Sequence, residues 1–260
     1  MKVGVTLPQF RADPAGVFEA ARAAEGMGLD GVFVFDHLWA IGRPDRPALA
    51  CWPLLGALAA QTSNITLGTL VARVSLAPDA VLAHQFETLA RIASEHRVTS
   101  ADAGDAGGAH RVIAGLGTGD RLSEPENAAY GIPFPPLDER LAQLADCARR
   151  TKQLGLETWV GGRSQAVRRI AVETEADALN LWDASPQDVR DAANHPGINA
   201  VTWGGTLPDA TPEVVGELLR DLEQAGAQWA VCGPRYRNED RDPTKAVAAV
   251  ASAVAISLAP

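Results

Sequence analysis

Apolar runs and amphipathic stretches alternate along the whole chain. Short runs rich in branched and aromatic side chains predict eight strands, at residues 3–7, 31–35, 65–71, 111–115, 157–161, 178–182, 200–203 and 228–232. Apolar residues at three- and four-residue spacing predict eight helices, at residues 17–27, 54–61, 80–93, 138–153, 164–174, 186–194, 212–225 and 244–258. This strict alternation predicts an α/β fold, a (β/α)8 TIM barrel formed by one domain over residues 1–260.

Local signals refine this pattern at the helix starts and at two polar segments. Asp13, Ser185 and Thr211 each precede a proline, an arrangement typical of an N-cap and a first helical residue. The glycine-rich segment 98–109 interrupts the alternation and is predicted to be a flexible insertion. Segment 123–136, with its four prolines, is predicted to be a loop above the barrel mouth.

Composition narrows the class of partner. Of the 260 residues 47% are hydrophobic, which is enough for a large core, and the formal net charge is -9. That charge argues against nucleic acid or an anionic membrane and favours a small molecule or another protein. The three cysteines lack metal-binding spacing, so we expect reduced thiols, no metal site and a cytoplasmic location. Residues 1–8 are typical of a first strand rather than a signal peptide.

Candidate chemistry lies after the predicted strands, because loops at the carboxyl-terminal ends of barrel strands converge on one pocket. Asp36 and His37 follow the second strand. An imidazole in a cleft exchanges protons near neutral pH, and a neighbouring carboxylate can orient it. Alternatively, both side chains only satisfy the backbone of a turn.

Glycines follow the fourth predicted strand. Gly115, Gly117 and Gly119 lie two apart and precede Asp120, which fits neither a dinucleotide fingerprint nor a phosphate-binding P-loop. They indicate that the backbone bends sharply or closely approaches a ligand or a neighbouring strand. Asp120 is interpreted either as a general acid or as the cap of a short helical turn.

A second turn, Gly161-Gly162-Arg163-Ser164, opens the helix after the fifth strand. Amide groups at a helix start beside an arginine favour an anion site, and a tight turn capped by Ser164 is compatible with that interpretation. Trp39 and Trp182 lie near strand ends and could stack on a flat ring, although tryptophan is more often a core residue.

Together, several of these segments resemble the bacterial luciferase-like superfamily. The resemblance rests on Leu7-Pro8-Gln9, Asp36-His37, residues 52–69, Gly115-Leu116-Gly117-Thr118-Gly119, and residues 159–164, in this order along nearly the whole chain. It looks closest to the branch that uses the deazaflavin coenzyme F420, with FMN-dependent members as near relatives. It implies a homodimeric oxidoreductase that transfers a hydride between F420, or alternatively FMN, and a small organic substrate.

The resemblance also implies roles for individual residues. His37 matches the family's base, and Asp120 stands where F420-dependent sugar dehydrogenases place a proton-donating glutamate. Cofactor binding is implied for the ring contact Asp36, for the bulged segment Thr69, Leu70 and Val71 with its non-prolyl cis peptide, for Gly117, Thr118 and Gly119, and for the phosphate turn Gly161, Gly162 and Arg163. Arg73, Arg163 and Arg235 are candidate partners for the anionic tail of F420.

Departures from the family pattern keep an alternative open. Leu76 replaces an arginine of the family, and residues 154–156 stand where relatives carry some tens of residues that help cover the pocket. A non-catalytic flavin- or deazaflavin-binding barrel, or a degenerate scaffold, therefore remains an alternative. A barrel lyase or isomerase without redox cofactor is less favoured, because Lys2, Lys152 and Lys245 lie away from the predicted strand ends.

Overall fold

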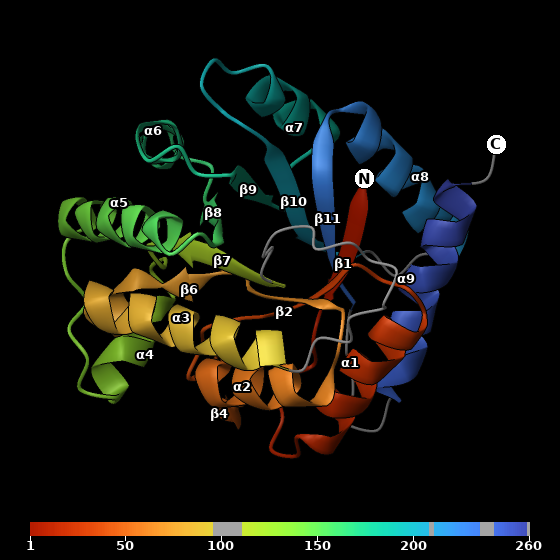
Figure 1. Cartoon of the computed structure of the whole chain (residues 1–260), viewed down its shortest axis with the longest axis horizontal. Coiled ribbons are helices and arrows are strands. Elements are labelled where there is room, and N and C mark those ends of the chain that lie inside the picture. The colour runs from red at the N-terminus through yellow and green to blue at the C-terminus, as the bar shows by residue number, and fades with distance from the viewer. Residues whose placement is uncertain (96–110, 208–210, 235–241, 259–260) are drawn as a thin grey trace.

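Eight parallel strands form a closed barrel in the computed structural model, which describes residues 1–95, 111–207, 211–234 and 242–258 (Figure 1). The strands are β1 (Lys2–Thr6), β2 (Gly31–Val34), β5 (Thr66–Thr69), β7 (Val112–Gly117), β8 (Glu157–Gly161), β9 (Ala178–Trp182), β10 (Val201–Thr206) and β11 (Ala227–Gly233). They pair in the order β5-β2-β1-β11-β10-β9-β8-β7. Pairing of β5 with β7, where Leu67 lies opposite Val112, closes the ring. The predicted TIM barrel is therefore confirmed.

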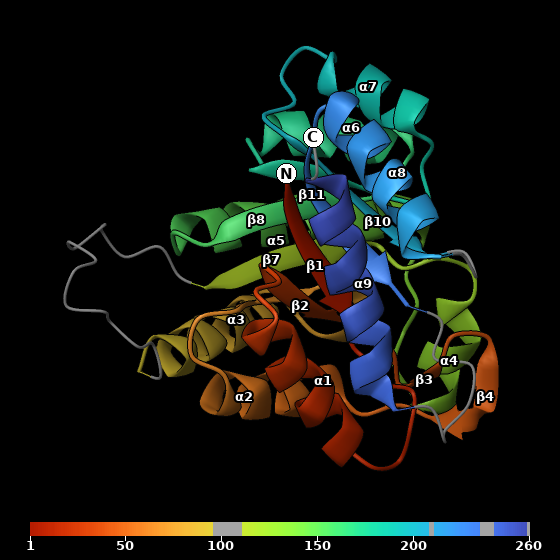
Figure 2. The ribbon, with the colours of Figure 1, turned by 90° about the vertical axis from the view of Figure 1, so that its right-hand side faces the viewer.

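Helices cover the outside of the barrel. They are α1 (Ala15–Gly26), α2 (Cys51–Gln61), α3 (Asp79–Glu95), α5 (Leu137–Gln153), α6 (Gln165–Glu173), α7 (Pro186–Ala193), α8 (Pro212–Gln224) and α9 (Pro243–Ser257). Figure 2 shows α9 running along the outside of β1, beside α8 and α1. These eight helices match the predicted ones within a few residues at each end. No helix in the described part of the chain is both long and apolar enough to cross a bilayer.

Large aromatic side chains fill the barrel interior. Phe33 stacks on Trp159 with 5.4 Å between ring centroids, and Trp229 meets both rings edge-on. All three are buried. Space for them comes from small neighbours, since a Cβ added at Gly31 would lie 2.9 Å from the Phe33 ring. The packed interior forms a floor beneath the strand ends.

Several elements near the barrel mouth were not predicted, among them the short strand β6 (Ala72–Arg73), which pairs with β7. A hairpin of β3 (Trp39–Ala40) and β4 (Arg43–Pro47) follows β2. Segment 123–136, predicted as a loop, begins instead with the helix α4 (Ser123–Ala129), so that prediction is wrong for its first half. Pro125 does not prevent this helix, because a proline in the first turn has no backbone hydrogen bond to lose. The segment 98–109, predicted as a flexible insertion, lies outside the described residues.

The predicted helix starts are supported to different degrees. Ser185 forms a capping box with Asp188, and the Asp13 carboxylate accepts a hydrogen bond from the Ala15 amide at 2.9 Å. Thr211 makes no side-chain cap bond to the helix that follows it.

The short connection 154–156 leads from α5 into the amino-terminal end of β8, whereas Gly161 lies at the other end of that strand. This connection therefore lies at the face of the barrel opposite the mouth. Its shortness does not remove any covering segment from the mouth.

Candidate active site

A cavity of about 520 Å³ opens at the carboxyl-terminal ends of the strands. It brings together most of the residues predicted for the site, namely His37, Leu70, Val71, Gly117, Thr118, Gly119, Asp120, Gly161 and Gly162. Seven further residues complete its lining, namely Phe35, Ile41, Arg73, Ser123, Asn180, Trp182 and Thr206. Its volume lies within the range of small-molecule sites.

The segment after β5 forms one wall of this cavity. The Leu70–Val71 peptide bond is cis, as the family resemblance implies. Gly117 and Gly161 face Val71 from β7 and β8; a Cβ on Gly161 would lie 2.8 Å from Val71 Cγ1, and one on Gly117 would overlap Cγ2. A Cβ on Gly115 would likewise overlap the Thr69 carbonyl. The missing side chains at these glycines therefore allow neighbouring strands to approach closely. This is the reason for the glycines after the fourth predicted strand.

Thr69 and Asp36, both predicted to bind the cofactor, lie behind this wall and do not line the cavity. Thr69 is fully buried, and its hydroxyl donates to the Gly115 carbonyl at 2.6 Å. Asp36 is also buried, and its carboxylate accepts a hydrogen bond from the Arg73 amide at 3.2 Å. Both side chains are used to hold the strand ends together.

His37 is held at the edge of the cavity by a glutamate from a distant element. Nδ1 of His37 lies 2.8 Å from Oε2 of Glu126, which belongs to α4 and is fully buried. The other oxygen of Glu126 accepts hydrogen bonds from the amides of Leu38 and, at 3.3 Å, Trp39. An ionised Glu126 requires the proton on Nδ1, which leaves Nε2 as the nitrogen that can take up a proton.

Arg73 connects this pair to Asp36. Its guanidinium lies 3.2 Å from Oε1 of Glu126 and donates to the Asn127 side chain at 3.1 Å and to the Asp36 carbonyl at 2.7 Å. The side chain is 2% exposed. Most of the Arg73 guanidinium is thus engaged by internal partners, although the residue also lines the cavity, and its suggested role in binding a cofactor tail stays a prediction.

The two carboxyl groups of this cluster respond to burial in opposite ways. Burial raises the pKa of Asp36 to about 6, although the hydrogen bond and the charge of Arg73 oppose the rise. Burial also acts to raise the pKa of Glu126, but hydrogen bonds from His37 and Leu38 outweigh it and leave that pKa below its ordinary value. Glu126 therefore stays charged across the neutral range, while Asp36 changes its charge near pH 6.

Asp120 lies in the turn before α4 and also lines the cavity. Its Oδ1 accepts a hydrogen bond from the Leu122 amide at 2.9 Å and so caps the entry to α4. The same residue lines the cavity and is exposed. It follows Gly119, whose φ of 70° places it in the left-handed region.

The turn after β8 supplies fewer residues to the cavity than its sequence suggests. Gly161 and Gly162 line the cavity, but the Gly162 amide donates to the Asn180 carbonyl at 3.0 Å. Ser164 caps α6 by accepting from the Val167 amide. Arg163, predicted to bind the cofactor, lies outside the cavity and pairs with Asp188 at 3.1 Å, and both side chains are about half exposed. Arg235 lies outside the described residues.

Comparison with known proteins supports the resemblance to the luciferase-like family. The luciferase-like monooxygenase family model matches residues 1–97. The F420-dependent glucose-6-phosphate dehydrogenase of Kineococcus radiotolerans is 31% identical over 208 residues, covering 76% of this chain and 52% of the relative. The enzyme of the same name from Nakamurella multipartita is 28% identical over 229 residues, covering 82% and 59%. The amino-terminal part of the chain thus matches the luciferase-like family, and its similarity to F420-dependent dehydrogenases extends over most of its length.

The chain spans about half the length of the curated relatives it matches. Its fold resembles that of an F420-dependent secondary alcohol dehydrogenase solved with an F420-acetone adduct, with a TM-score of 0.72 and 14% identity over 97% of this chain and 98% of that one. At that identity the likeness concerns the fold alone.

The sequence did not indicate Glu126 as a site residue, and it did not decide whether Trp39 and Trp182 contact a ligand or belong to the core. Trp182 lines the cavity, whereas Trp39 packs against Tyr130 with 6.2 Å between ring centroids. Glu126 lies in a segment predicted as loop, 89 residues from His37, and no local pattern joins them. The site therefore depends on the long-range contact between His37 and Glu126, which no sequence pattern predicts.

Proposed function

We propose that this chain is an oxidoreductase that transfers a hydride between coenzyme F420 and a small organic substrate, with FMN as the alternative cofactor. The observation that carries the proposal is His37, fixed by the buried carboxylate of Glu126 at the edge of a cavity backed by Leu70 and Val71. Similarity to F420-dependent dehydrogenases supports F420 over FMN.

The residues of the cavity fit a flat, partly polar ring. Leu70, Val71, Phe35 and Trp182 provide apolar surface, which suits a large planar ring system. Hydrogen-bonding groups are supplied by His37, Thr118, Asp120, Asn180 and Thr206. A bound deazaflavin would supply the hydride acceptor or donor. Of the residues suggested to hold it, Val71, Gly117 and Gly161 form the rigid wall.

His37 is the proposed proton-transfer group. In the direction of substrate oxidation, Nε2 would accept the proton of a substrate hydroxyl while Glu126 keeps the ring in place through Nδ1. The carboxylate of Glu126 would then stabilise the resulting imidazolium. Asp120, exposed at the mouth, is the proposed second proton-transfer group.

The experiment is a titration of the purified protein with F420 and, separately, with FMN, followed by cofactor fluorescence. We expect micromolar F420 binding and at least about tenfold weaker FMN binding. His37→Ala should bind F420 within about threefold of the wild type but should not reduce it with glucose 6-phosphate or small secondary alcohols. His84→Ala, at an exposed position on α3, is the matched control.

Each other outcome has a distinct meaning. If neither cofactor binds, the proposal fails. Tight F420 binding without turnover on any substrate would favour the alternative, a non-catalytic deazaflavin-binding barrel.

We also propose, from the resemblance alone, that the protein acts as a cytoplasmic homodimer. Light scattering of the purified protein, with a mass near twice the 27.3 kDa of one chain, tests the first part.

A further inference from the structure

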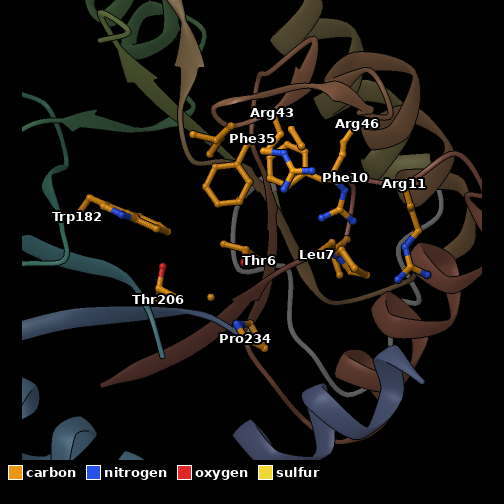
Figure 3. A pocket seen from close by; sticks show the side chains of 14 residues that line it. Thr6, Leu7, Phe10, Arg11, Phe35, Arg43, Arg46, Trp182, Thr206 and Pro234 are labelled. Atoms are coloured by element: carbon orange, nitrogen blue, oxygen red, sulfur yellow. The ribbon is translucent and has the colours of Figure 1, made fainter. Parts of the chain in front are cut away.

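A second cavity, of about 300 Å³, adjoins the first at the barrel mouth (Figure 3). It lies over the carboxyl-terminal ends of β1 and β11, lined there by Thr6 and Gly233, and the β3–β4 hairpin covers it. The two cavities have shared lining residues, namely Phe35, Ile41, Trp182 and Thr206. A molecule in the second cavity would therefore abut whatever occupies the first.

Three arginines line this second cavity, and none of its described lining residues is acidic. Arg43 and Arg46 come from the hairpin, and Arg11 from the segment after β1. Arg43 forms a bidentate pair with Asp45 at 2.9 and 3.0 Å, but both of those side chains are more than half exposed. Because the whole chain carries a net charge of -9, this group of cations is a local feature.

The second cavity has a cationic side and an aromatic side. In Figure 3 the three arginines lie on one side, and Trp182 and Thr206 lie across the cavity from them. Phe35 stacks on Phe10 with 5.7 Å between centroids and meets Trp182 edge-on at the same distance. Phe10 in turn meets the His37 ring edge-on at 6.5 Å. The cavity thus leads from the guanidinium groups toward the proposed proton-transfer group.

We propose that this cavity is the substrate chamber and that Arg43, Arg46 and Arg11 select a small substrate with an anionic end. A carboxylate or a phosphate monoester is the matching chemistry, because the guanidinium fork binds both through paired hydrogen bonds. The volume is at the lower limit of small-molecule pockets, which restricts the body of the substrate to a few carbons or one small ring. The anionic end binds at the arginines, and the reacting carbon lies toward His37.

The second part of this inference, the direction of the reacting carbon, rests on the proposed hydride transfer. The anion site itself does not, since it follows from the lining of the cavity alone. The two claims can therefore fail separately.

The test is calorimetric titration with three probes, inorganic phosphate, acetate and neutral glycerol, at constant ionic strength, with and without saturating F420. The wild type is compared with the double variant Arg43→Gln/Arg46→Gln. Arg149→Gln is the matched control, because Arg149 is an exposed arginine on α5 that also pairs with a nearby aspartate, Asp146.

We expect millimolar binding of at least one anion and no binding of glycerol. The double variant should bind that anion at least about tenfold more weakly, while Arg149→Gln stays within about twofold of the wild type. Preference for phosphate assigns a phosphate monoester, and preference for acetate assigns a carboxylate.

No anion binding by the wild type, or equal binding by the double variant, would overturn the proposal. F420 titration of the same variants verifies the fold and separates the two claims. If the protein binds an anion but not F420, the anion site is supported and the proposed hydride transfer is contradicted. If it binds F420 but no anion, the anion site is contradicted and the proposed hydride transfer stands.

Discussion

Two buried arginines at opposite ends of the barrel hold it together in different ways. Arg111, at the start of β7, donates hydrogen bonds to the carbonyls of Ala59, Thr62, Ile65 and Ala93 and to the Thr62 hydroxyl. Arg73, at the mouth, contacts the carboxylate of Glu126 and the backbone of Asp36. Backbone carbonyls do not titrate, whereas carboxylates do. Arg111 is thus hydrogen-bonded to groups that keep the same charge at every pH, with the Glu25 carboxylate near enough to feel its charge, whereas Arg73 contacts a carboxylate directly.

The largest predicted effect is on stability at the closed end. Arg111→Met removes these hydrogen bonds and leaves several buried carbonyls without a donor, each at a cost of about 1–3 kcal/mol before relaxation. We expect the free energy of unfolding to fall by about 3–5 kcal/mol in urea titrations. A loss below about 1 kcal/mol would show that water replaces these bonds and would contradict the structural role.

At the mouth, the predicted effect is on the site. Glu126→Leu removes the acceptor that holds His37 Nδ1–H and leaves Arg73 without its ion pair. We expect nitrogen NMR to report the Nδ1–H tautomer of His37 in the wild type and a mixture of tautomers in the variant, with turnover reduced by about 100-fold or more.

Two further variants sharpen this prediction. Glu124→Gln changes an exposed carboxylate on the same helix and should leave the tautomer unchanged. Glu126→Gln keeps an oxygen acceptor and should retain part of the ordering. An unaltered His37 spectrum in Glu126→Leu would remove Glu126 from the role of positioning residue.

The charges at the mouth also predict a pH dependence of stability. Because the pKa of Asp36 is raised from 3.8 to about 6, the folded state binds this proton more tightly than the unfolded state. Between these two values the contribution of Asp36 to the free energy of unfolding should therefore fall as pH rises, by about 3 kcal/mol. Asp36→Asn should abolish that slope in chemical unfolding measured from pH 4 to pH 7, and an identical slope in the variant would contradict the assignment.

Glu126 contributes in the opposite direction. Its pKa is lowered in the folded state, so the stability it adds is present at neutral pH and is lost as pH falls through the acid range. In Asp36→Asn this acid loss should remain as the visible slope at the mouth.

The sequence predicts the barrel well because its signals are local. Each strand is a short apolar run and each helix an amphipathic one, so the closed order follows from alternation alone. The hairpin was missed because β4 carries Pro44 and Pro47 and is almost wholly exposed, which argues against a strand. Helix α4 was missed because it has only seven residues and includes Pro125.

Prediction of the site succeeded where the signal lay in neighbouring residues and failed where it depended on residues far apart in the sequence. Positions after strand ends led to His37 and Gly117, and the family resemblance led to Val71. The structure gathers all three around one cavity. The partner of His37 comes from 89 residues away, in a segment without periodic pattern. The turn at Arg163 was predicted from a local rule, yet its side chain pairs with the surface carboxylate of Asp188 and does not line the cavity.

The smallest predicted effect concerns the cavity wall where Gly117 and Gly161 face Val71. A methyl group on Gly117 would overlap Val71 Cγ2, so Gly117→Ala should push Val71 into the cavity. We expect F420 affinity to fall by about tenfold, which corresponds to about 1.4 kcal/mol. The double variant Gly117→Ala/Val71→Ala removes the overlapping methyl groups and should restore part of the affinity. If Gly117→Ala alone binds F420 as tightly as the wild type, Val71 moves elsewhere and the wall is not the ring's support.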